Sequence, residues 1–221
     1  MNDYMLKNAA LIFYHAQLDR CSKDDPQEVT TTLRLPSDGC SKDNPQEGTT
    51  DLKSQLNMCC NAEQESKKAK RTCSPWMLGM TKHHKRILEQ GGLLDDLVIY
   101  AALMLLRDQF PTMPGFQPTV LCQVKGFKPM NTDGIQIHYT GKEHWVTTAL
   151  SDGSVFLYDS YVGNTETLPL SLKEQFSTVY KCAANDSALI VTQYPVQQQS
   201  GSTDCGLFST AFAYHAAIGD N

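Results

Sequence analysis

Apolar residues concentrate in the part of the chain that follows about residue 75. Residues 93–107 are apolar around the whole circumference of a helix, apart from three charged positions, which is typical of a helix buried on most sides. Asp95 and Asp96 fall in its first turn, where the helix dipole favours negative charge. Pro111 prevents the helix from continuing.

Short β-branched segments after this helix predict strands. They comprise residues 119–124, 135–139, 145–150, 155–158 and 188–194. Asp152 and Gly153 separate two of them, and Asp-Gly between strand-like runs is a strong signal for a β-hairpin. The last apolar stretch, 206–218, predicts a helix that ends at Gly219. Together these segments predict a mixed α+β domain.

The predicted hairpin also fixes which side chains share a face of the sheet. A two-residue turn at Asp152-Gly153 places Asp159 opposite Val146. His144, two residues from Val146, then points to the same face as Asp159, with β-carbons about 7 Å apart. We therefore expect an imidazole–carboxylate hydrogen bond between His144 and Asp159. The alternative is that both are ordinary polar groups on a sheet face.

Residues 1–74 read as a flexible, low-complexity segment rich in polar residues and proline. The segment Cys21–Thr31 recurs nineteen positions later as Cys40–Thr50, with nine of eleven positions identical. Two polar copies cannot build a stacked repeat fold, so we interpret them as a tandem duplication in a linker. A docking motif presented twice is the alternative.

The composition excludes several classes of protein. The chain has 221 residues, 41% hydrophobic and 19% charged, which allows a globular core. It contains no run of 18 apolar residues, and its formal charge of −5 disfavours nucleic-acid binding, so we expect neither a membrane nor a nucleic acid as partner. The start lacks signal-peptide character and the eight cysteines lack a disulfide pattern, which predicts an intracellular protein of the nucleus or cytoplasm.

Two short basic runs, residues 67–71 and 82–86, are typical of a solvated face, with nuclear targeting as the alternative. No paired CxxC motif is present, and the spacings of cysteine and histidine match no standard zinc finger. We therefore expect no metal and no cofactor.

Cys205 has the best local setting for a nucleophile. It follows Asp204 and opens the last predicted helix, where the helix dipole favours the thiolate. Gly206 removes a side chain beside it, which lets a substrate backbone approach. The polar loop before it predicts that the thiol lies at the surface. For acyl transfer, the N–H of Cys205 and the side-chain amide of Gln199 are candidate donors to an oxyanion.

A cysteine nucleophile needs a base within reach, and His144 is the best candidate. It begins a strand, precedes Trp145 and has Asp159 as an orienting acid. His138 and His215 lie on a predicted strand and a predicted helix, and we expect both to be structural.

These residues form an ordered pattern of three motifs. The motifs are His144-Trp145, Tyr158-Asp159-Ser160 and Gln199-x-Gly201-x-x-Asp204-Cys205-Gly206. The pattern resembles the ubiquitin-like-protein-specific cysteine protease family, the SUMO-deconjugating enzymes and their adenoviral-protease relatives. The resemblance implies an α+β papain-like, adenain-like fold with a central mixed sheet flanked by helices.

The resemblance also assigns roles to individual residues. It implies Cys205 as nucleophile, His144 as general base, Asp159 as its orienting acid and Gln199 as the oxyanion-hole glutamine. Trp145 matches the tryptophan that packs over the C-terminal glycines of the substrate. Asp204 and Gly206 flank the nucleophile and count with Trp145 as candidate substrate-binding residues.

The match covers residues 85–221, so the expected protease domain spans residues 75–221. Gly92 stands where the family has a tryptophan, which removes one wall of its diglycine tunnel. The chain ends sixteen residues after Cys205, where family domains carry further helical sequence, and this predicts a C-terminally truncated domain. A looser resemblance connects the chain to members spread by transposable elements in invertebrate genomes.

The expected function is that of a thiol protease. It would cut peptide or isopeptide bonds after the C-terminal glycines of a ubiquitin-like modifier of the SUMO type, or at a related polyprotein site. The alternative is a catalytically inactive, transposon-derived remnant that at most binds a ubiquitin-like protein.

Overall fold

The computed structural model describes residues 78–161, 168–181 and 189–219. The flexible segment expected at residues 1–74, its duplicated sequence and the basic run at 67–71 lie outside the described residues. The exact start expected for the protease domain, residue 75, lies outside them as well.

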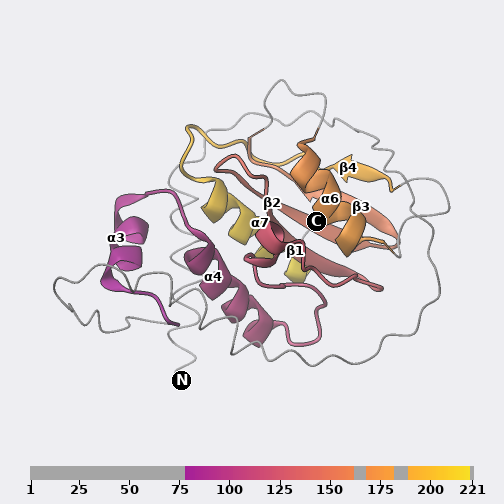
Figure 1. Ribbon diagram of the computed structural model, residues 1–221, viewed down its shortest axis with the longest axis horizontal. Helices are drawn as coiled ribbons and strands as arrows, with labels where there is room; N and C mark the ends of the chain where they lie inside the picture. The colour runs from indigo at the N-terminus through magenta and orange to yellow at the C-terminus, as the bar shows by residue number, and fades with distance from the viewer. Residues whose placement is uncertain (1–77, 162–167, 182–188, 220–221) are drawn as a thin grey trace. The chain divides into compact units, whose positions relative to one another are not determined.

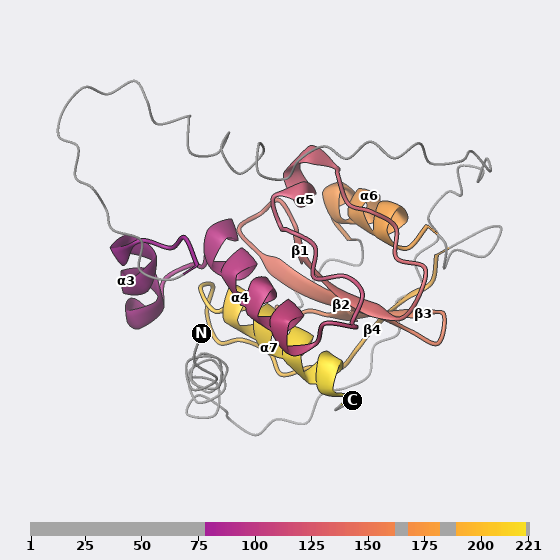
Figure 2. The same ribbon diagram turned by 90° about the horizontal axis from the view of Figure 1, so that it is seen from below.

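The described residues form helices and strands in a mixed order (Figure 1). In chain order these are α3 (Lys82–Gln90), α4 (Asp96–Gln109), α5 (Leu121–Val124), β1 (Gly134–Tyr139), β2 (Trp145–Ser151), β3 (Ser154–Tyr158), α6 (Leu170–Val179), β4 (Val191–Gln193) and α7 (Cys205–Ile218). The sheet order is β1-β2-β3-β4, with antiparallel pairs up to β3 and a parallel β3–β4 pair. Helices cover both faces of this sheet, as Figure 2 shows. The expected α+β fold with a central mixed sheet flanked by helices is therefore confirmed.

The β2–β3 hairpin has the predicted turn and register. Asp152 and Gly153 adopt positive φ angles of 50° and 75°, the backbone conformation that tight hairpin turns require. Ser151 pairs with Ser154, and the ladder continues in register to the pair of Thr147 and Tyr158. Continued by one more residue, this register places Val146 opposite Asp159. The start of β2 therefore lies beside the end of β3.

One face of the sheet packs against α4 and α7. Ile135 and Ile137 of β1 and Trp145 of β2 enter this core together with buried residues of α4. Thr147 donates a hydrogen bond of 2.6 Å to the carbonyl of Ser209, which ties the middle of α7 to the sheet. The C-terminal helix ends as predicted, because Gly219 caps it in the left-handed conformation at φ 74°.

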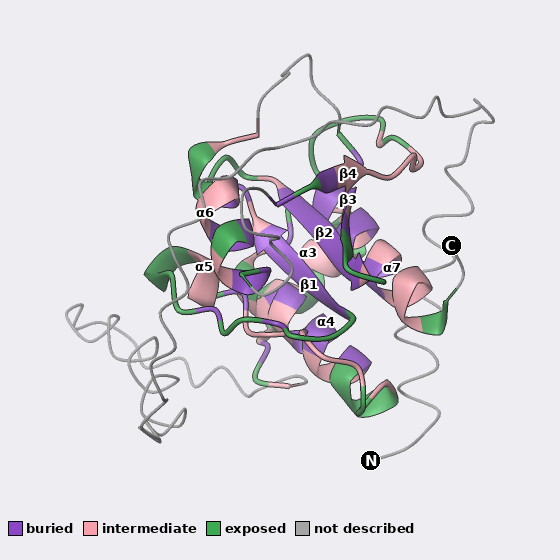
Figure 3. Ribbon diagram, turned by 90° about the vertical axis from the view of Figure 1, so that its right-hand side faces the viewer, coloured by how far each residue is buried: buried purple, intermediate pink, exposed green. Residues whose placement is uncertain are grey.

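The opposite face packs against α5 and α6. His138 is fully buried there, with Nδ1 3.1 Å from Oε1 of Gln175 and Nε2 2.8 Å from Oγ1 of Thr148. Burial lowers the pKa of His138 to about 3, against the opposing effect of the Gln175 hydrogen bond, so the ring is neutral. The expected structural role of this histidine is confirmed. The two strands β1 and β2 between these helical layers are almost wholly buried (Figure 3).

Three elements differ from the predictions. Residues 119–124 form tight turns and the short helix α5, because the backbone N–H groups of Leu121, Cys122 and Gln123 donate to carbonyls three residues earlier. The predicted strand at 188–194 is reduced to β4, Val191–Gln193. Helix α4 begins at Asp96, later than position 93, because the side chain of Asp95 accepts a hydrogen bond of 3.0 Å from the N–H of Val98 and caps it.

Helices α3 and α6 were not predicted. The basic run at 82–86 lies on α3, which has no buried residue, so the solvated-face interpretation is confirmed. Among the described residues, no helix combines the length and the apolar character needed to span a bilayer.

Candidate active site

Cys205 is the first residue of α7. Its backbone N–H therefore has no acceptor within the helix, and the positive end of the helix dipole lies at its side chain. Both features were predicted from the sequence, and both favour a thiolate and a donor for an oxyanion.

The thiol is buried, which contradicts the expected surface position. Cys205 is only 1% exposed, and its sulfur lies 3.7 Å from the carbonyl oxygen of Glu143. Burial arises because the loop between β1 and β2, which the sequence could not place, passes over the start of α7.

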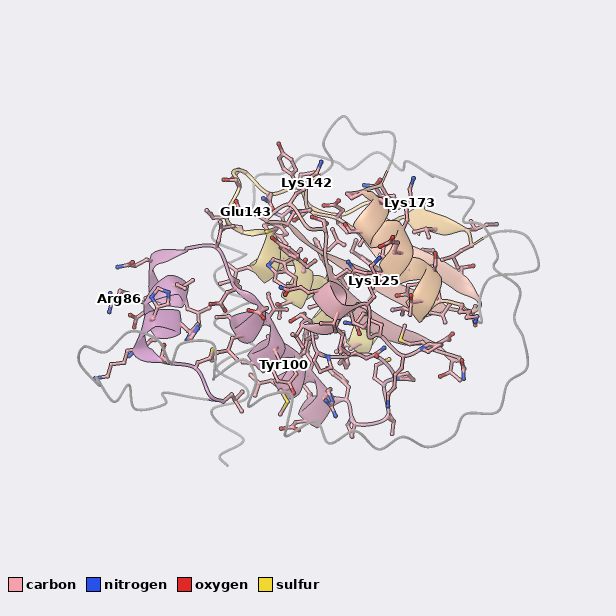
Figure 4. The ribbon with its side chains drawn as sticks, in the orientation of Figure 1. Arg86, Tyr100, Lys125, Lys142, Glu143 and Lys173 are labelled. Atoms are coloured by element: carbon pink, nitrogen blue, oxygen red, sulfur yellow. The ribbon has the colours of Figure 1, made fainter. Side chains whose placement is uncertain are left out.

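This covering loop has a tight and partly strained geometry. Gly141 adopts φ 85° and Glu143 adopts φ 53°, a left-handed conformation that is uncommon for a residue other than glycine. The N–H of Thr140 donates to the carbonyl of His144 at 2.9 Å, and the N–H of Glu143 donates to the hydroxyl of Tyr139 at 3.0 Å. These contacts hold the peptide that follows Glu143 with its carbonyl toward the sulfur. Figure 4 labels Glu143 on this loop.

His144 and Asp159 meet as the hairpin register predicts. Nε2 of His144 lies 2.7 Å from Oδ1 of Asp159, and each side chain is 17% exposed. Asp159 occupies Nε2, which leaves Nδ1 to face the thiol of Cys205, and the sulfur lies close enough to the ring to raise its pKa. The structure thus brings the predicted acid, base and nucleophile together.

The electrostatic environment of His144 favours its charged form. Burial by itself lowers the pKa of the imidazole, but the hydrogen bonds to Asp159 and to Cys205 raise it, as do the negative charges of both partners. The net effect raises the pKa of His144 to about 9. Near neutral pH the ring is therefore an imidazolium between a carboxylate and a sulfur, an arrangement that stabilises a thiolate.

Tyr161 supports this pair and was not foreseen. Its backbone N–H donates to Oδ1 of Asp159 at 2.9 Å, and its half-exposed ring lies edge-on to His144 with centroids 6.1 Å apart. The available signal was local, because an aspartate commonly accepts a hydrogen bond from the N–H two residues later.

Gln199 belongs to a loop that is tied to the end of β3. Its backbone N–H donates to the carbonyl of Ser160 at 2.8 Å, and its Oε1 accepts from the hydroxyl of Ser160 at 2.8 Å. Its Nε2 donates to the carbonyl of Gly201 at 2.7 Å. Gln198 differs, because its amide donates to the carbonyl of Asp159 at 3.1 Å and its side chain lies in a more exposed position. The sequence singled out Gln199 and gave Ser160 no role.

The candidate substrate-binding residues are all buried. Trp145 is 5% exposed, and its indole N–H donates to the carbonyl of Leu94 at 2.9 Å. Asp204 occupies the N-cap position of α7 and is 9% exposed. A β-carbon on Gly206 would lie 2.9 Å from Leu94 and 3.1 Å from Ile99.

Glycine at position 206 thus allows α7 to approach α4. We expected this glycine to make room for a substrate backbone. The structure shows instead that it makes room for Leu94 and Ile99.

No group of three or more histidine, cysteine, aspartate or glutamate side chains among the described residues has the geometry of a metal site. His84, the histidine of the basic run that points inward, is engaged otherwise. Its Nδ1 accepts from the N–H of Thr81 at 2.9 Å, which caps α3, and its Nε2 lies 3.3 Å from Asp95.

The chain has structural similarity to SUMO proteases. It matches the C-terminal Ulp1 protease domain in complex with Smt3, the yeast ortholog of SUMO, with a TM-score of 0.49 and 12% identity. It also matches Ulp1 with its catalytic cysteine oxidised to a sulfinic acid (TM-score 0.48, 14% identity) and to a sulfenic acid (TM-score 0.46, 12% identity). Each match covers 79% of this chain and 86% of the other. No family model and no curated protein matches the sequence.

Proposed function

We propose that this protein is a cysteine peptidase that cuts peptide or isopeptide bonds after the C-terminal glycines of a ubiquitin-like modifier, or at a related polyprotein site. The observation that carries the proposal is the position of His144, whose ring contacts the carboxylate of Asp159 at 2.7 Å and the thiol of Cys205. Acyl transfer to a thiol requires a base beside the nucleophile and an acid that orients the base, and the three side chains have this arrangement.

The proposed reaction begins with the thiolate of Cys205 and the imidazolium of His144. The sulfur attacks the carbonyl carbon of the last glycine and forms a C–S bond, while the carbonyl π electrons move to its oxygen. His144 then gives its proton to the leaving amine as the C–N bond breaks, which leaves a thioester. A water molecule, deprotonated by His144, attacks the thioester; the C–S bond breaks, which releases the modifier with a free C-terminal carboxyl group and restores the thiolate of Cys205 and the imidazolium of His144.

The negative oxygen of each tetrahedral intermediate needs donors that are already oriented. In the proposed mechanism the backbone N–H of Cys205 is one donor, because the first turn of α7 leaves it without an acceptor in the helix. The side-chain amide of Gln199 is the second donor. Both groups lie on the chain that leads into α7.

The loop over the thiol leaves little room for a substrate, so a scissile site with very small side chains is the one that a small opening of this loop would admit. Cys205 is 1% exposed beneath the loop that carries Glu143. Two consecutive glycines present only backbone and need the narrowest channel of any dipeptide. The sequence resemblance to ubiquitin-like-protein-specific proteases supports the same substrate class, with Trp145 as the residue proposed to border that channel.

One observation favours the second candidate, an inactive binding module. The same 1% exposure means that no substrate reaches the sulfur unless the loop over it moves. If the loop is fixed, the protein binds a modifier at most and never reacts with it.

The proposal is tested by incubating the protein with a panel of ubiquitin-like modifiers, each joined through its C-terminal glycine to a short peptide, and following cleavage on gels. Cleavage of at least one modifier fusion by the wild type and none by Cys205→Ala is expected. Cys122→Ala is the matched control and should keep full activity, since Cys122 packs against the opposite core. Absence of cleavage across the panel, or cleavage that survives Cys205→Ala, contradicts the proposal.

A further inference from the structure

Ser160 and Gln199 are joined by two hydrogen bonds although 39 positions separate them. The hydroxyl of Ser160 lies 2.8 Å from Oε1 of Gln199, and the carbonyl of Ser160 accepts from the N–H of Gln199 at 2.8 Å. Ser160 is 1% exposed, so water does not compete for this hydroxyl. The mechanism above assigns Ser160 no part.

The direction of these bonds follows from the partner on the other side of the amide. A carbonyl oxygen can only accept, so the group of Gln199 that lies 2.7 Å from the carbonyl of Gly201 must be the NH₂. Oε1 then faces Ser160, and because Oε1 is itself only an acceptor, the hydroxyl of Ser160 must donate. The polarity of the amide is therefore determined by its two partners together.

The second N–H of the Gln199 amide has no acceptor among the described residues, which leaves it available to a ligand. We propose that Ser160 is a positioning residue, which holds the amide so that this N–H, and not Oε1, is presented to the oxyanion. This inference rests on the proposed function and adds the residue that orients its side-chain donor.

The neighbouring glutamine, Gln198, makes different contacts. Nε2 of Gln198 lies within 3.1 Å of the carbonyl of Asp159 and 3.2 Å of the carbonyl of Val196, contacts made on an exposed stretch of the chain. The amide oxygen of Gln199 instead accepts from the buried hydroxyl of Ser160. Without the Ser160 hydroxyl, the Gln199 amide would keep only its bond to the carbonyl of Gly201, and the amide group could rotate.

A double-mutant cycle tests this role in the full chain. Turnover of a cleaved modifier fusion is measured for wild type, Ser160→Ala, Gln199→Ala and the double variant. Ser160→Ala is expected to lower kcat by about 3- to 10-fold, the effect of one lost hydrogen bond, with KM unchanged. In the Gln199→Ala background the same change is expected to have no further effect, because there is no amide left to position.

Equal losses in both backgrounds would overturn the inference, since Ser160 would then only support the fold. Ser177→Ala is the matched control, because its exposed hydroxyl donates to the carbonyl of Lys173 within α6 and its loss should leave kcat and KM unchanged. Melting temperatures of all variants show whether each one folds.

A second measurement does not depend on activity. The side-chain NH₂ signals of Gln199 are identified in a ¹⁵N spectrum by their absence from the spectrum of Gln199→Ala. The rate at which these hydrogens exchange with water is then measured in the wild type and in Ser160→Ala. Faster exchange in Ser160→Ala supports the positioning role, and unchanged exchange overturns it. If the wild type cuts no modifier, the proposed function fails, and the spectrum still decides whether Ser160 orients the amide.

Discussion

His144 Nε2 lies 2.7 Å from Asp159 Oδ1, although the two residues are separated by 15 positions. The β2–β3 hairpin produces this contact, because its two-residue turn at Asp152-Gly153 sets the register that brings the start of β2 beside the end of β3. The contact between His144 and Asp159 is thus a consequence of the turn that sets the register. A change in the turn is expected to affect the site, even though the turn lies at the other end of both strands.

Asp159→Asn should narrow the pH range of activity on its alkaline side. The carboxylate helps to raise the pKa of His144 to about 9, above its ordinary value of about 6.5, so the imidazolium persists until pH approaches 9. Asparagine keeps the oxygen but loses the charge, and the pKa of His144 should fall. In the wild type, kcat/KM is expected to decline only above about pH 9, and in the variant the decline should begin at lower pH. If kcat/KM declines over the same alkaline pH range in both proteins, Asp159 does not raise the pKa of His144 as proposed.

The same pKa has a consequence for folding stability. Because the folded-state pKa of His144 lies above the unfolded value, its contribution to stability is complete below about pH 6.5 and is lost as pH rises to about 9. Asp159→Asn should therefore lose less stability than the wild type between these two pH values, in denaturant titrations at each pH.

Gln199→Ala should lower kcat by about 10²- to 10³-fold with little change in KM, the usual effect of removing one oxyanion donor. Gln197→Ala is the matched control, since it removes the same amide two positions away. Steady-state kinetics on one modifier fusion measure both parameters. Similar losses from the two variants would show that these amides support the loop and do not contact the reaction.

Cys205 should react with iodoacetamide well before Cys122 near neutral pH. Burial raises the pKa of Cys122 to about 11, so that this thiol is protonated, whereas the sulfur of Cys205 lies beside the imidazolium of His144 and is expected to react when the loop over it opens. Peptide mass spectrometry at successive times gives both rates within one sample. His144→Ala should slow labelling of Cys205 and leave that of Cys122 unchanged. Faster labelling of Cys122 in the wild type is the contrary outcome.

Gly153→Ala should lower the free energy of unfolding by about 1 kcal/mol. Gly153 has φ 75°, and a β-carbon there would meet nothing within 4 Å, so the effect is one of backbone conformation alone. Asp152→Asn keeps a residue that tolerates positive φ and should be nearly neutral. Urea titrations measure both, and an equal stability of wild type and Gly153→Ala would contradict the assigned turn.

Local patterns in the sequence predicted much of the site. Asp-Gly between two strand-like runs was sufficient to place His144 beside Asp159, and a polar loop before an apolar helix was sufficient to place Cys205 at a helix start. The burial of Cys205 could not be predicted, because it depends on the loop between β1 and β2, which contacts the start of α7 only in the folded structure. The position of Glu143 in that loop involves a left-handed φ that its residue type does not signal.

Helix α6 was missed for a related reason. Its buried positions, Leu172, Gln175, Phe176 and Val179, have helical spacing, but one of them is polar and conceals the pattern. Gln175 is buried because its amide donates to the carbonyl of Tyr139 and its Oε1 contacts His138, partners on a different element. Contacts of this kind are tertiary, so the sequence pattern of the helix alone does not contain them.

The central claim is that the thiol of Cys205, activated by His144, attacks the C-terminal glycine of a ubiquitin-like modifier. Modifiers that carry an electrophile in place of their C-terminal carboxylate test this most directly, with the adduct detected by intact mass and located by peptide mapping. A one-to-one adduct on Cys205 is expected with at least one modifier, with no adduct on Cys205→Ala and a much slower one on His144→Ala. An adduct on another cysteine, or none with any modifier while the protein is folded, would contradict it.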